Sequence, residues 1–168
     1  MEPPFSVALT GSPGTGKTTI AALAKEAGWR VTTVTALAEM YDMILEQDQD
    51  GVHPIDIHGL ASAVEFNDPV LIDGHLSHLL PVEASAIIRC DPSVLSDRLK
   101  LRDYPIWKIE SNVEWEMVGG PWGDKPNGRV AEFDATIISP NALWMNIEAW
   151  LLSGAPNRLP QIDWLSGS

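Results

Sequence analysis

The sequence contains a single cysteine, Cys90, in 168 residues. One cysteine excludes an internal disulfide and a zinc site built from several thiolates, and it fits a reducing compartment. No uninterrupted apolar run approaches the roughly 20 residues that a membrane-spanning helix needs. The opening residues, MEPPFSVALT, lack the basic region of a secretory signal. We therefore expect a cytoplasmic protein without a membrane segment.

Positive charge is also scarce. The chain has 11 Lys and Arg against 23 Asp and Glu, which gives a formal net charge of −12 at pH 7. A surface this acidic lacks the positive field that attracts a phosphate backbone, so we expect no direct binding of DNA or RNA. A basic protein partner, in contrast, would be attracted. The apolar fraction of 45% is normal for a globular core and excludes wholesale disorder.

Internal repeats and low-complexity blocks are missing as well, and strand-like runs alternate with helical patterns. This alternation is typical of an α/β protein with a mostly parallel sheet. The length suits one domain, expected to span residues 1–168. The expected strands are 5–10, 30–34, 69–73, 84–90 and 129–138. The expected helices are 17–27, 36–45, 57–66, 93–102 and 141–152.

Two segments break this alternation. Residues 118–128 (VGGPWGDKPNG) are rich in glycine and proline, which predicts a surface loop rather than a helix or a central strand. Residues 154–168 are predicted to form a tail, with Trp164 packed back against the body of the protein.

The strongest motif is residues 11–18 (GSPGTGKT), which match the pattern GxxxxGK[ST] at every fixed position. An apolar strand precedes it and a helix follows. In such a loop, glycines let backbone N–H groups surround phosphate oxygens, Lys17 reaches the β- and γ-phosphates, and the Thr18 hydroxyl binds Mg²⁺. The alternative is a glycine-rich turn with a chance lysine. The motif does not say whether water, a metabolite, a nucleotide or a protein accepts the phosphoryl group.

A second acid follows an apolar strand. Residues 70–73 (VLID) have the form of a Walker-B element, and Asp73 at the carboxyl end of that strand would lie beside the phosphate loop and hold Mg²⁺ through water. The alternative is an ordinary strand-terminal aspartate. His75 either orients an attacking oxygen or is satisfied by backbone groups. For His78, on an apolar turn, the structural interpretation is favoured.

Three of the few cations lie close together in the sequence. Arg98 and Arg102 are four residues apart on one helical face, and Lys108 follows shortly after. Cations near a transferring phosphoryl group neutralise developing charge. The alternative is surface pairing with acids such as Asp97 and Asp103.

Four segments together resemble the adenylate kinase isoenzyme 6 family, and its archaeal members above all. They are residues 11–19 (GSPGTGKTT), 71–81 (LIDGHLSHLLP), 87–104 (IIRCDPSVLSDRLKLRDY) and 108–116 (KIESNVEWE). The resemblance covers roughly residues 4–152, and the second and third segments are much more selective than the phosphate loop alone.

The resemblance implies a three-layer P-loop NTPase fold of the nucleoside-monophosphate kinase type, with a five-stranded parallel sheet between helices. It implies a nucleoside-monophosphate-binding segment at about 33–55 and a short lid at about 101–111. The implied activity is Mg²⁺-dependent transfer of a phosphoryl group from ATP to AMP, giving two ADP, together with ATPase activity. Family members also assist small-subunit rRNA maturation through a basic ribosomal protein, which would be a partner here.

Carried over by position, the resemblance implies roles for individual residues. The implied catalytic residues are Lys17, Asp73, His75 and Arg102. The implied ATP-binding residues are Gly14, Thr15, Gly16, Lys17, Thr18, Thr19 and Arg102. Thr18 and Asp73 would bind the Mg²⁺ ion.

Two positions depart from the family pattern. Asp103 replaces the glycine of an RGY triplet, and Glu39 stands where relatives carry a cation directed at the acceptor phosphate. A carboxylate there would repel AMP. This departure favours a second hypothesis, in which the protein is an ATP-switched ribosome-assembly chaperone with little acceptor phosphorylation. A third possibility is a small-metabolite kinase of similar fold.

Overall fold

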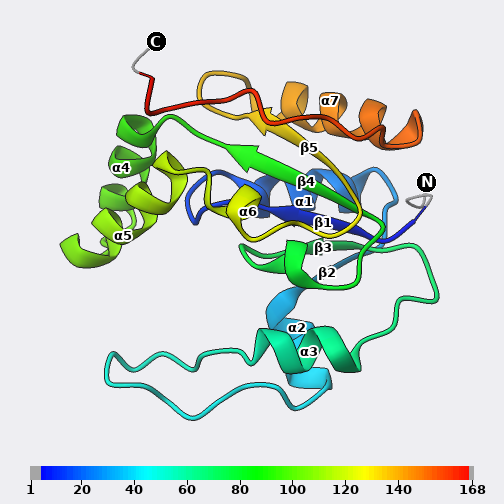
Figure 1. The fold of residues 1–168 in the computed structure, drawn as a ribbon, viewed down its shortest axis with the longest axis horizontal. Helices are drawn as coiled ribbons and strands as arrows, with labels where there is room; N and C mark the ends of the chain where they lie inside the picture. The colour runs from blue at the N-terminus through cyan, green and yellow to red at the C-terminus, as the bar shows by residue number, and fades with distance from the viewer. Residues whose placement is uncertain (1–4, 167–168) are drawn as a thin grey trace.

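The computed structural model describes residues 5–166. Residues 1–4 and 167–168, which are the ends of the expected domain and tail, lie outside the described part of the chain. One sheet of five parallel strands forms the centre, in the order β2-β3-β1-β4-β5 (Figure 1). The strands are β1 Val7–Thr10, β2 Val31–Thr33, β3 Leu71–Asp73, β4 Ala84–Arg89 and β5 Arg129–Asp134.

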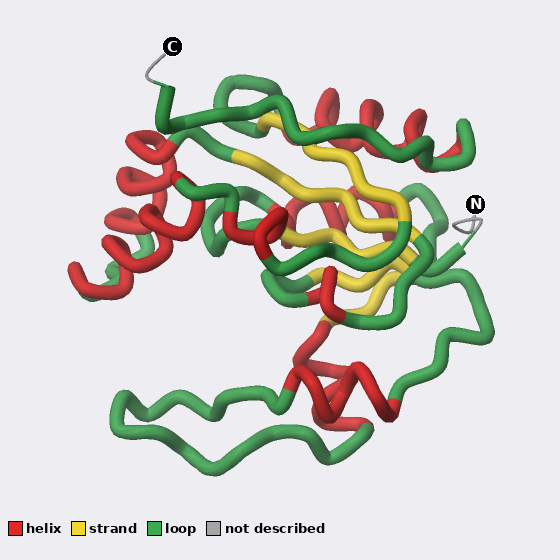
Figure 2. Tube along the Cα trace, viewed as in Figure 1, coloured by secondary structure: helices red, strands yellow, loops and turns green. Residues whose placement is uncertain are grey.

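Helices cover both faces of this sheet (Figure 2). They are α1 Lys17–Glu26, α2 Val34–Met40, α3 Ile57–Ala63, the 3-10 helix η1 Ser77–Leu79, α4 Pro92–Leu101, α5 Ile106–Met117, α6 Gly120–Gly123 and α7 Pro140–Leu152. Helices α1 and α7 pack on one face, and α2, α3 and η1 pack on the other. The expected five-stranded parallel sheet between helices is therefore confirmed.

Strand β1 shows why this sequence forms a central strand. All four of its residues are buried. Val7 and Leu9 belong to the core on the α1 and α7 side, whereas Ala8 belongs to the core on the α2 and α3 side. A strand that is covered on both faces needs a continuous apolar run, and VAL supplies one.

The parallel arrangement brings all five carboxyl ends to one edge. Leu9 of β1 pairs with Asp73 of β3, so the phosphate-loop segment and Asp73 leave the sheet side by side. Helices α4 and α5 lie beyond the arrowheads of the strands, and the long loop between α2 and α3 extends below them (Figure 1). Ligands of open α/β sheets bind at this edge.

The helix expected at 36–45 was wrong at both ends. Helix α2 begins at Val34, the last residue of the strand expected at 30–34, and ends at Met40. Its start is fixed by Thr33, whose Oγ1 accepts a hydrogen bond from the N–H of Ala36 at 3.0 Å. The chain then leaves the helix, and Asp42 adopts a left-handed conformation with φ of 55°.

The segment 118–128 is not a plain loop, because it contains the short helix α6. Pro121 is tolerated there because it lies in the first turn of the helix. A backbone N–H in that turn has no intrahelical acceptor, so the N–H that proline lacks is not missed. Gly120 packs directly against Trp115, and a Cβ on it would lie 2.0 Å from that ring. No larger residue fits at this position.

The remaining expected elements differ mainly in length. Asp56 caps α3 as expected by accepting from the N–H of Gly59, but that helix ends at Ala63. Strand β5 ends at Asp134, whose side chain accepts the N–H of Thr136 and turns the chain out of the sheet. Within residues 5–166, no helix combines the length and apolar character needed to cross a bilayer.

The C-terminal segment runs back over the body, as expected for Trp164. The N–H of Arg158 donates to the carbonyl of Val130 in β5 at 2.8 Å. The indole N–H of Trp164 donates to Glu116 Oε1 at 3.0 Å. These bonds fix the segment at two separate points.

Candidate active site

Residues 11–16 connect β1 to α1 and form a loop that only glycine allows at its first position. Gly11 has φ of 139°, and a Cβ on it would lie 2.3 Å from the carbonyl oxygen of Ile88 in β4. Gly16 precedes α1 in a left-handed conformation with φ of 101°. The loop therefore ends at a helix N-terminus, where free N–H groups attract anions.

Lys17 opens α1 and its side chain folds back over the loop. Its Nζ donates to the carbonyl oxygens of Gly11 at 2.8 Å and Ser12 at 2.9 Å. Burial lowers the pKa of Lys17 to about 8, with Arg102 acting in the same direction and Asp73 in the opposite one. The ammonium group is thus held against the first two residues of the loop.

Asp73 ends β3 next to the start of α1. Burial raises the pKa of its carboxyl group, while the charge of Lys17 and a hydrogen bond with the Thr18 side chain act against that rise. A hydroxyl and a carboxylate thus contact each other beside the loop. These are hard oxygen donors, the kind that Mg²⁺ prefers, so the pair fits that ion.

One cavity brings the expected catalytic side chains together. It has a volume of about 710 Å³, and its walls include Lys17, Thr18, Asp73, His75, Arg102 and Lys108. The imidazole of His75 remains open to this space. Desolvation, together with the charges of Lys17, His78 and Lys108, lowers the pKa of His75 to about 4.

A second cavity of about 350 Å³ shares Gly14, Gly16 and Arg102 with the first. Its polar wall includes Gly14, Thr15, Gly16, Thr19, Arg98 and Arg102. Its apolar wall includes Ile20, Leu101, Ala135, Ile138 and Leu143. Apolar side chains and the phosphate loop thus line the same cavity. Such a lining suits a flat heterocycle attached to phosphates.

Arg98 and Arg102 behave differently. Arg98 donates to the carbonyl oxygens of Gly14 at 3.4 Å and Ala135 at 3.1 Å, so it braces the phosphate loop against the chain after β5. Arg102 follows α4 and lines both cavities. Among the described residues neither arginine forms an ion pair with a carboxylate, so the alternative of surface pairing with Asp97 or Asp103 is wrong.

Glu39 and Asp103, which depart from the family pattern, lie in different parts of the structure. Glu39 is exposed on α2 and does not line the cavity that contains Lys17. Asp103 has φ of 56°, a left-handed conformation that glycine adopts freely and that aspartate tolerates better than most residues. The turn after α4 therefore keeps the shape that a glycine would give it.

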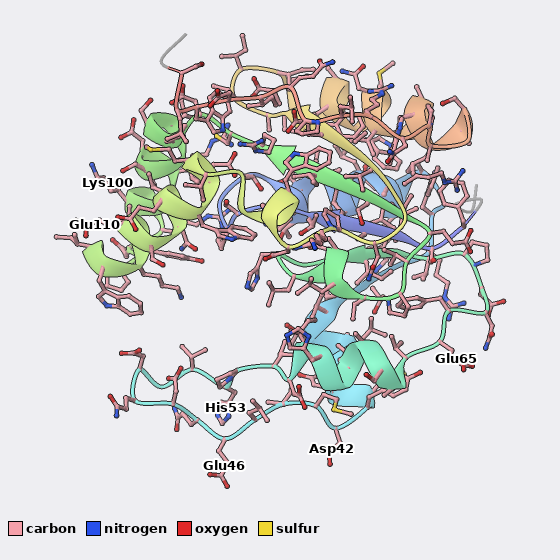
Figure 3. The ribbon with its side chains drawn as sticks, in the orientation of Figure 1. Asp42, Glu46, His53, Glu65, Lys100 and Glu110 are labelled. Atoms are coloured by element: carbon pink, nitrogen blue, oxygen red, sulfur yellow. The ribbon has the colours of Figure 1, made fainter. Side chains whose placement is uncertain are left out.

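The α2–α3 loop borders this site. Figure 3 shows Glu46 pointing away from the body at its outer edge, and His53 lies on the returning half of the same loop. Val52 of this loop lines the cavity that contains Lys17. The segment 33–55 carries no Lys or Arg.

Two groups near the site were missed by the sequence analysis. Asn112 of α5 lines the cavity containing Lys17, and its Nδ2 is the one buried polar side-chain atom of residues 5–166 without a hydrogen-bond partner. Glu116, one turn further along α5, is completely buried and accepts a hydrogen bond from Ser12 in the phosphate loop. Glu110 of the same helix points outward (Figure 3), and no pattern in the sequence separates it from Glu116.

The chain is similar to known proteins along most of its length. Residues 7–119 match the family described as an AAA domain. The chain is 36% identical over 166 residues to a protein of Archaeoglobus fulgidus named "Putative adenylate kinase", covering 95% of this chain and 92% of that one. It is 37% identical over 164 residues to a protein of the same name from Thermococcus onnurineus, covering 94% and 90%.

Solved structures show the same fold at low identity. A gluconokinase from Sinorhizobium meliloti superposes with a TM-score of 0.62 at 18% identity, covering 92% of this chain and 95% of that one. A shikimate kinase from Bacteroides thetaiotaomicron gives 0.53 at 16% identity, covering 88% and 98%. The fold is that of P-loop kinases, and the chain belongs to the family of archaeal proteins named "Putative adenylate kinase".

Proposed function

We propose that this protein is an adenylate kinase, which transfers the γ-phosphoryl group of ATP to AMP and forms two ADP. The observation that carries the proposal is that Lys17, Thr18, Asp73, His75 and Arg102 line one cavity. A second, largely apolar cavity adjoins it along the phosphate loop. The name shared by its archaeal relatives supports AMP as the acceptor. The single cysteine supports a cytoplasmic localisation.

The proposed ATP site uses both cavities. The triphosphate lies on the N–H groups of residues 14–19, with Lys17 at the β- and γ-phosphates. The adenine lies in the cavity walled by Ile20 and Leu143. Arg102 lines both spaces and contacts the phosphates from the opposite side.

The proposed metal site consists of Thr18 and Asp73. Mg²⁺ bound there would neutralise charge on the β- and γ-phosphates. The Thr18 hydroxyl and the Asp73 carboxylate hold each other in place beside the loop, and the charge of Lys17 opposes the rise in the pKa of Asp73 that burial causes.

The proposed acceptor site lies between the segments 33–55 and 101–111, the latter acting as a lid. The lid contains the turn from Leu101 to Pro105 and the first half of α5. When it closes, water leaves the site, and Arg102 and Lys108 come onto the phosphates. Neutral His75 orients the acceptor oxygen, because its lowered pKa keeps the ring uncharged near neutral pH.

One observation favours a second function. The segment 33–55 offers no Lys or Arg to hold the phosphate of AMP. Without such a cation the acceptor binds weakly, and ATP hydrolysis then becomes the main reaction. In this second proposal the protein is an ATP-switched chaperone for a basic ribosomal protein of the small subunit, attracted by the net charge of −12.

Product analysis separates the two functions. Purified protein is incubated with Mg-ATP, with and without AMP, and Lys17→Ala serves as the inactive control. Two ADP formed for each AMP consumed, with little free phosphate, supports the kinase. Free phosphate with AMP untouched supports the chaperone, and absence of both products contradicts both proposals.

A further inference from the structure

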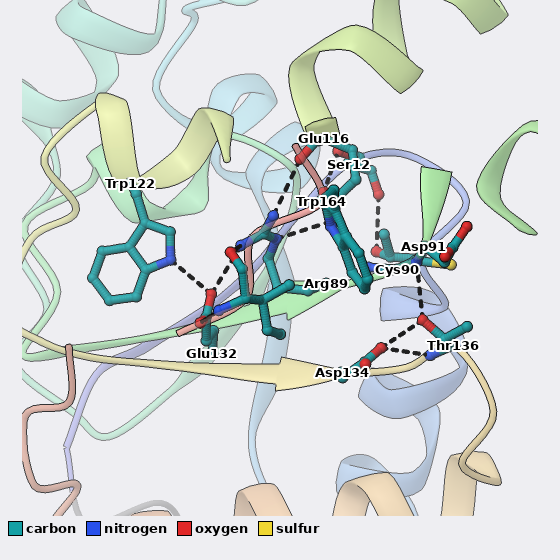
Figure 4. Close-up of polar contacts among 12 residues, drawn as sticks. Ser12, Arg89, Cys90, Asp91, Glu116, Trp122, Glu132, Asp134, Thr136 and Trp164 are labelled. Carbon is teal, nitrogen blue, oxygen red and sulfur yellow. Dashed lines mark hydrogen bonds and ion pairs between the residues drawn. The ribbon is translucent and has the colours of Figure 1, made fainter. Parts of the chain in front are cut away.

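The carboxylate of Glu116 is a buried junction between three distant parts of the chain. Its Oε2 accepts from the Ser12 hydroxyl in the phosphate loop at 2.9 Å. Its Oε1 accepts from Arg89 Nε at 2.9 Å, from the backbone N–H of Cys90 at 3.0 Å and from the indole N–H of Trp164 at 3.0 Å (Figure 4). Glu116 exposes none of its surface, so these four donors satisfy it in place of water.

A second carboxylate holds the C-terminal segment that carries Trp164. Oε1 of Glu132 accepts the backbone N–H groups of Gln161 at 2.6 Å and Ile162 at 2.7 Å. Its Oε2 accepts from Arg89 and from the indole N–H of Trp122, both at 2.9 Å (Figure 4). The segment is therefore fixed just before Trp164, and the Trp164 indole also lies near the Arg89 guanidinium.

Ser12 connects this junction to the chemistry of the phosphate loop. Its hydroxyl donates to Glu116, while its carbonyl oxygen accepts from Lys17 Nζ at 2.9 Å. The same carbonyl oxygen accepts from the Thr15 hydroxyl at 2.8 Å and the Thr15 N–H at 3.3 Å. Ser12 thus links the Glu116 carboxylate to Lys17 and to Thr15 of the phosphate loop.

We propose that Trp164 is a positioning residue for the phosphate loop. The C-terminal segment holds the Glu116 carboxylate in the orientation that fixes Ser12, and Ser12 in turn fixes Lys17 and the loop. Trp164 touches no loop residue in this chain of contacts and acts through Glu116. The effect on nucleotide binding rests on the ATP site proposed above, whereas the effect on the loop does not.

The outer members of the junction are the ones to change. Removing the Glu116 carboxylate would leave the buried Arg89 guanidinium with one carboxylate partner, Glu132, and such changes commonly unfold a protein. Trp164→Phe removes one N–H donor and keeps an aromatic ring. Ser12→Ala removes the hydroxyl at the other end. Trp122→Phe is the matched control, because it removes an indole donor from Glu132 and leaves every bond to Glu116 intact.

The first measurement is hydrogen exchange of the amides in residues 11–18 without nucleotide. Trp164→Phe is expected to speed exchange in this loop, and Trp122→Phe is not. In a Ser12→Ala background, Trp164→Phe is expected to add nothing, because the connection is already cut. Equal effects of the two tryptophan variants, or additive effects of Trp164→Phe and Ser12→Ala, would overturn the proposal.

The second measurement is the affinity for a non-hydrolysable ATP analogue with Mg²⁺. Trp164→Phe is expected to weaken binding about fivefold in the normal protein and less than about twofold in the Ser12→Ala background, a typical coupling through a shared network. If the unchanged protein binds no ATP analogue while the loop still responds in hydrogen exchange, the proposed ATP site fails and the positioning role of Trp164 stands. An unchanged loop overturns the positioning role alone.

Discussion

The imidazole of His78 is fixed by Asp124, with Nε2 2.9 Å from Oδ2. The ring exposes none of its surface, and its Nδ1 lies 2.7 Å from the Thr10 hydroxyl at the end of β1. Burial lowers the pKa of His78 despite the nearby carboxylate, and Nε2–H donates to Asp124. The arrangement joins the end of α6 to the strand that precedes the phosphate loop.

Asp124→Ala is expected to lower the free energy of unfolding by about 1 kcal/mol, because it leaves the buried Nε2–H group with at best a water as its partner. Urea unfolding followed by circular dichroism measures this. Asp50→Ala, on the exposed α2–α3 loop, is the control and should change stability by less than about 0.5 kcal/mol. Equal stability of the two variants would show that the His78 contact is not structural.

Lys17→Ala is expected to reduce ATP turnover about 100-fold or more, because the main cation at the proposed phosphate site is lost. Turnover is measured as ADP formation, and circular dichroism checks that the variant is folded. Lys25→Ala, at the far end of the same helix, is the matched control and should retain turnover. Near-normal activity of Lys17→Ala would refute the proposed phosphate site.

Asp73→Asn is expected to raise the Mg²⁺ concentration for half-maximal turnover about tenfold, because the amide keeps the shape but loses the charge of a proposed metal-site oxygen. A magnesium titration at saturating ATP measures this shift. Asp68→Asn, exposed shortly before the same strand, is the control. An unchanged magnesium requirement in Asp73→Asn would exclude Asp73 from the metal site.

The sequence predicts best those features that a short pattern determines. The phosphate loop needs glycine at Gly11 because β4 lies against it, and Asp73 follows from one apolar strand. The five strands were found for the same reason. The ends of the helices and strands were predicted less accurately, because local hydrogen bonds determine them. The Thr33 side chain, for example, fixes the start of helix α2.

Contacts between distant segments could not be predicted in this way. Glu116 is one of several acids along α5, and only the fold shows that Ser12, Arg89 and Trp164 converge on it. The sequence leaves open whether Arg98 faces the transferred phosphoryl group or a nearby acid, and only the fold shows that its guanidinium donates to the carbonyl oxygens of Gly14 and Ala135. These partners come from the phosphate loop, β4, the C-terminal segment and the turn after β5, which no local pattern brings together.

The thiol of Cys90 is completely buried beyond β4, next to the Glu116 junction. Its pKa is raised from 9.0 to about 11, mainly by burial; the charge of Arg98 opposes this rise, and the carboxylates of Glu116, Asp134 and Asp91 contribute to it. The thiol therefore stays neutral and inaccessible in the folded protein at pH 8. Iodoacetamide is expected to modify it much faster in urea than in buffer.

The same shift predicts how stability depends on alkaline pH. The unfolded thiol ionises near pH 9, whereas the folded thiol remains protonated until about pH 11. Its contribution is therefore complete below pH 9 and is lost as the pH rises toward 11, since the folded state then binds more protons than the unfolded state. Urea unfolding between pH 8 and 11 should show a shallower fall in stability for Cys90→Ala than for the unchanged protein. Identical slopes would mean that the Cys90 pKa does not differ between the two states.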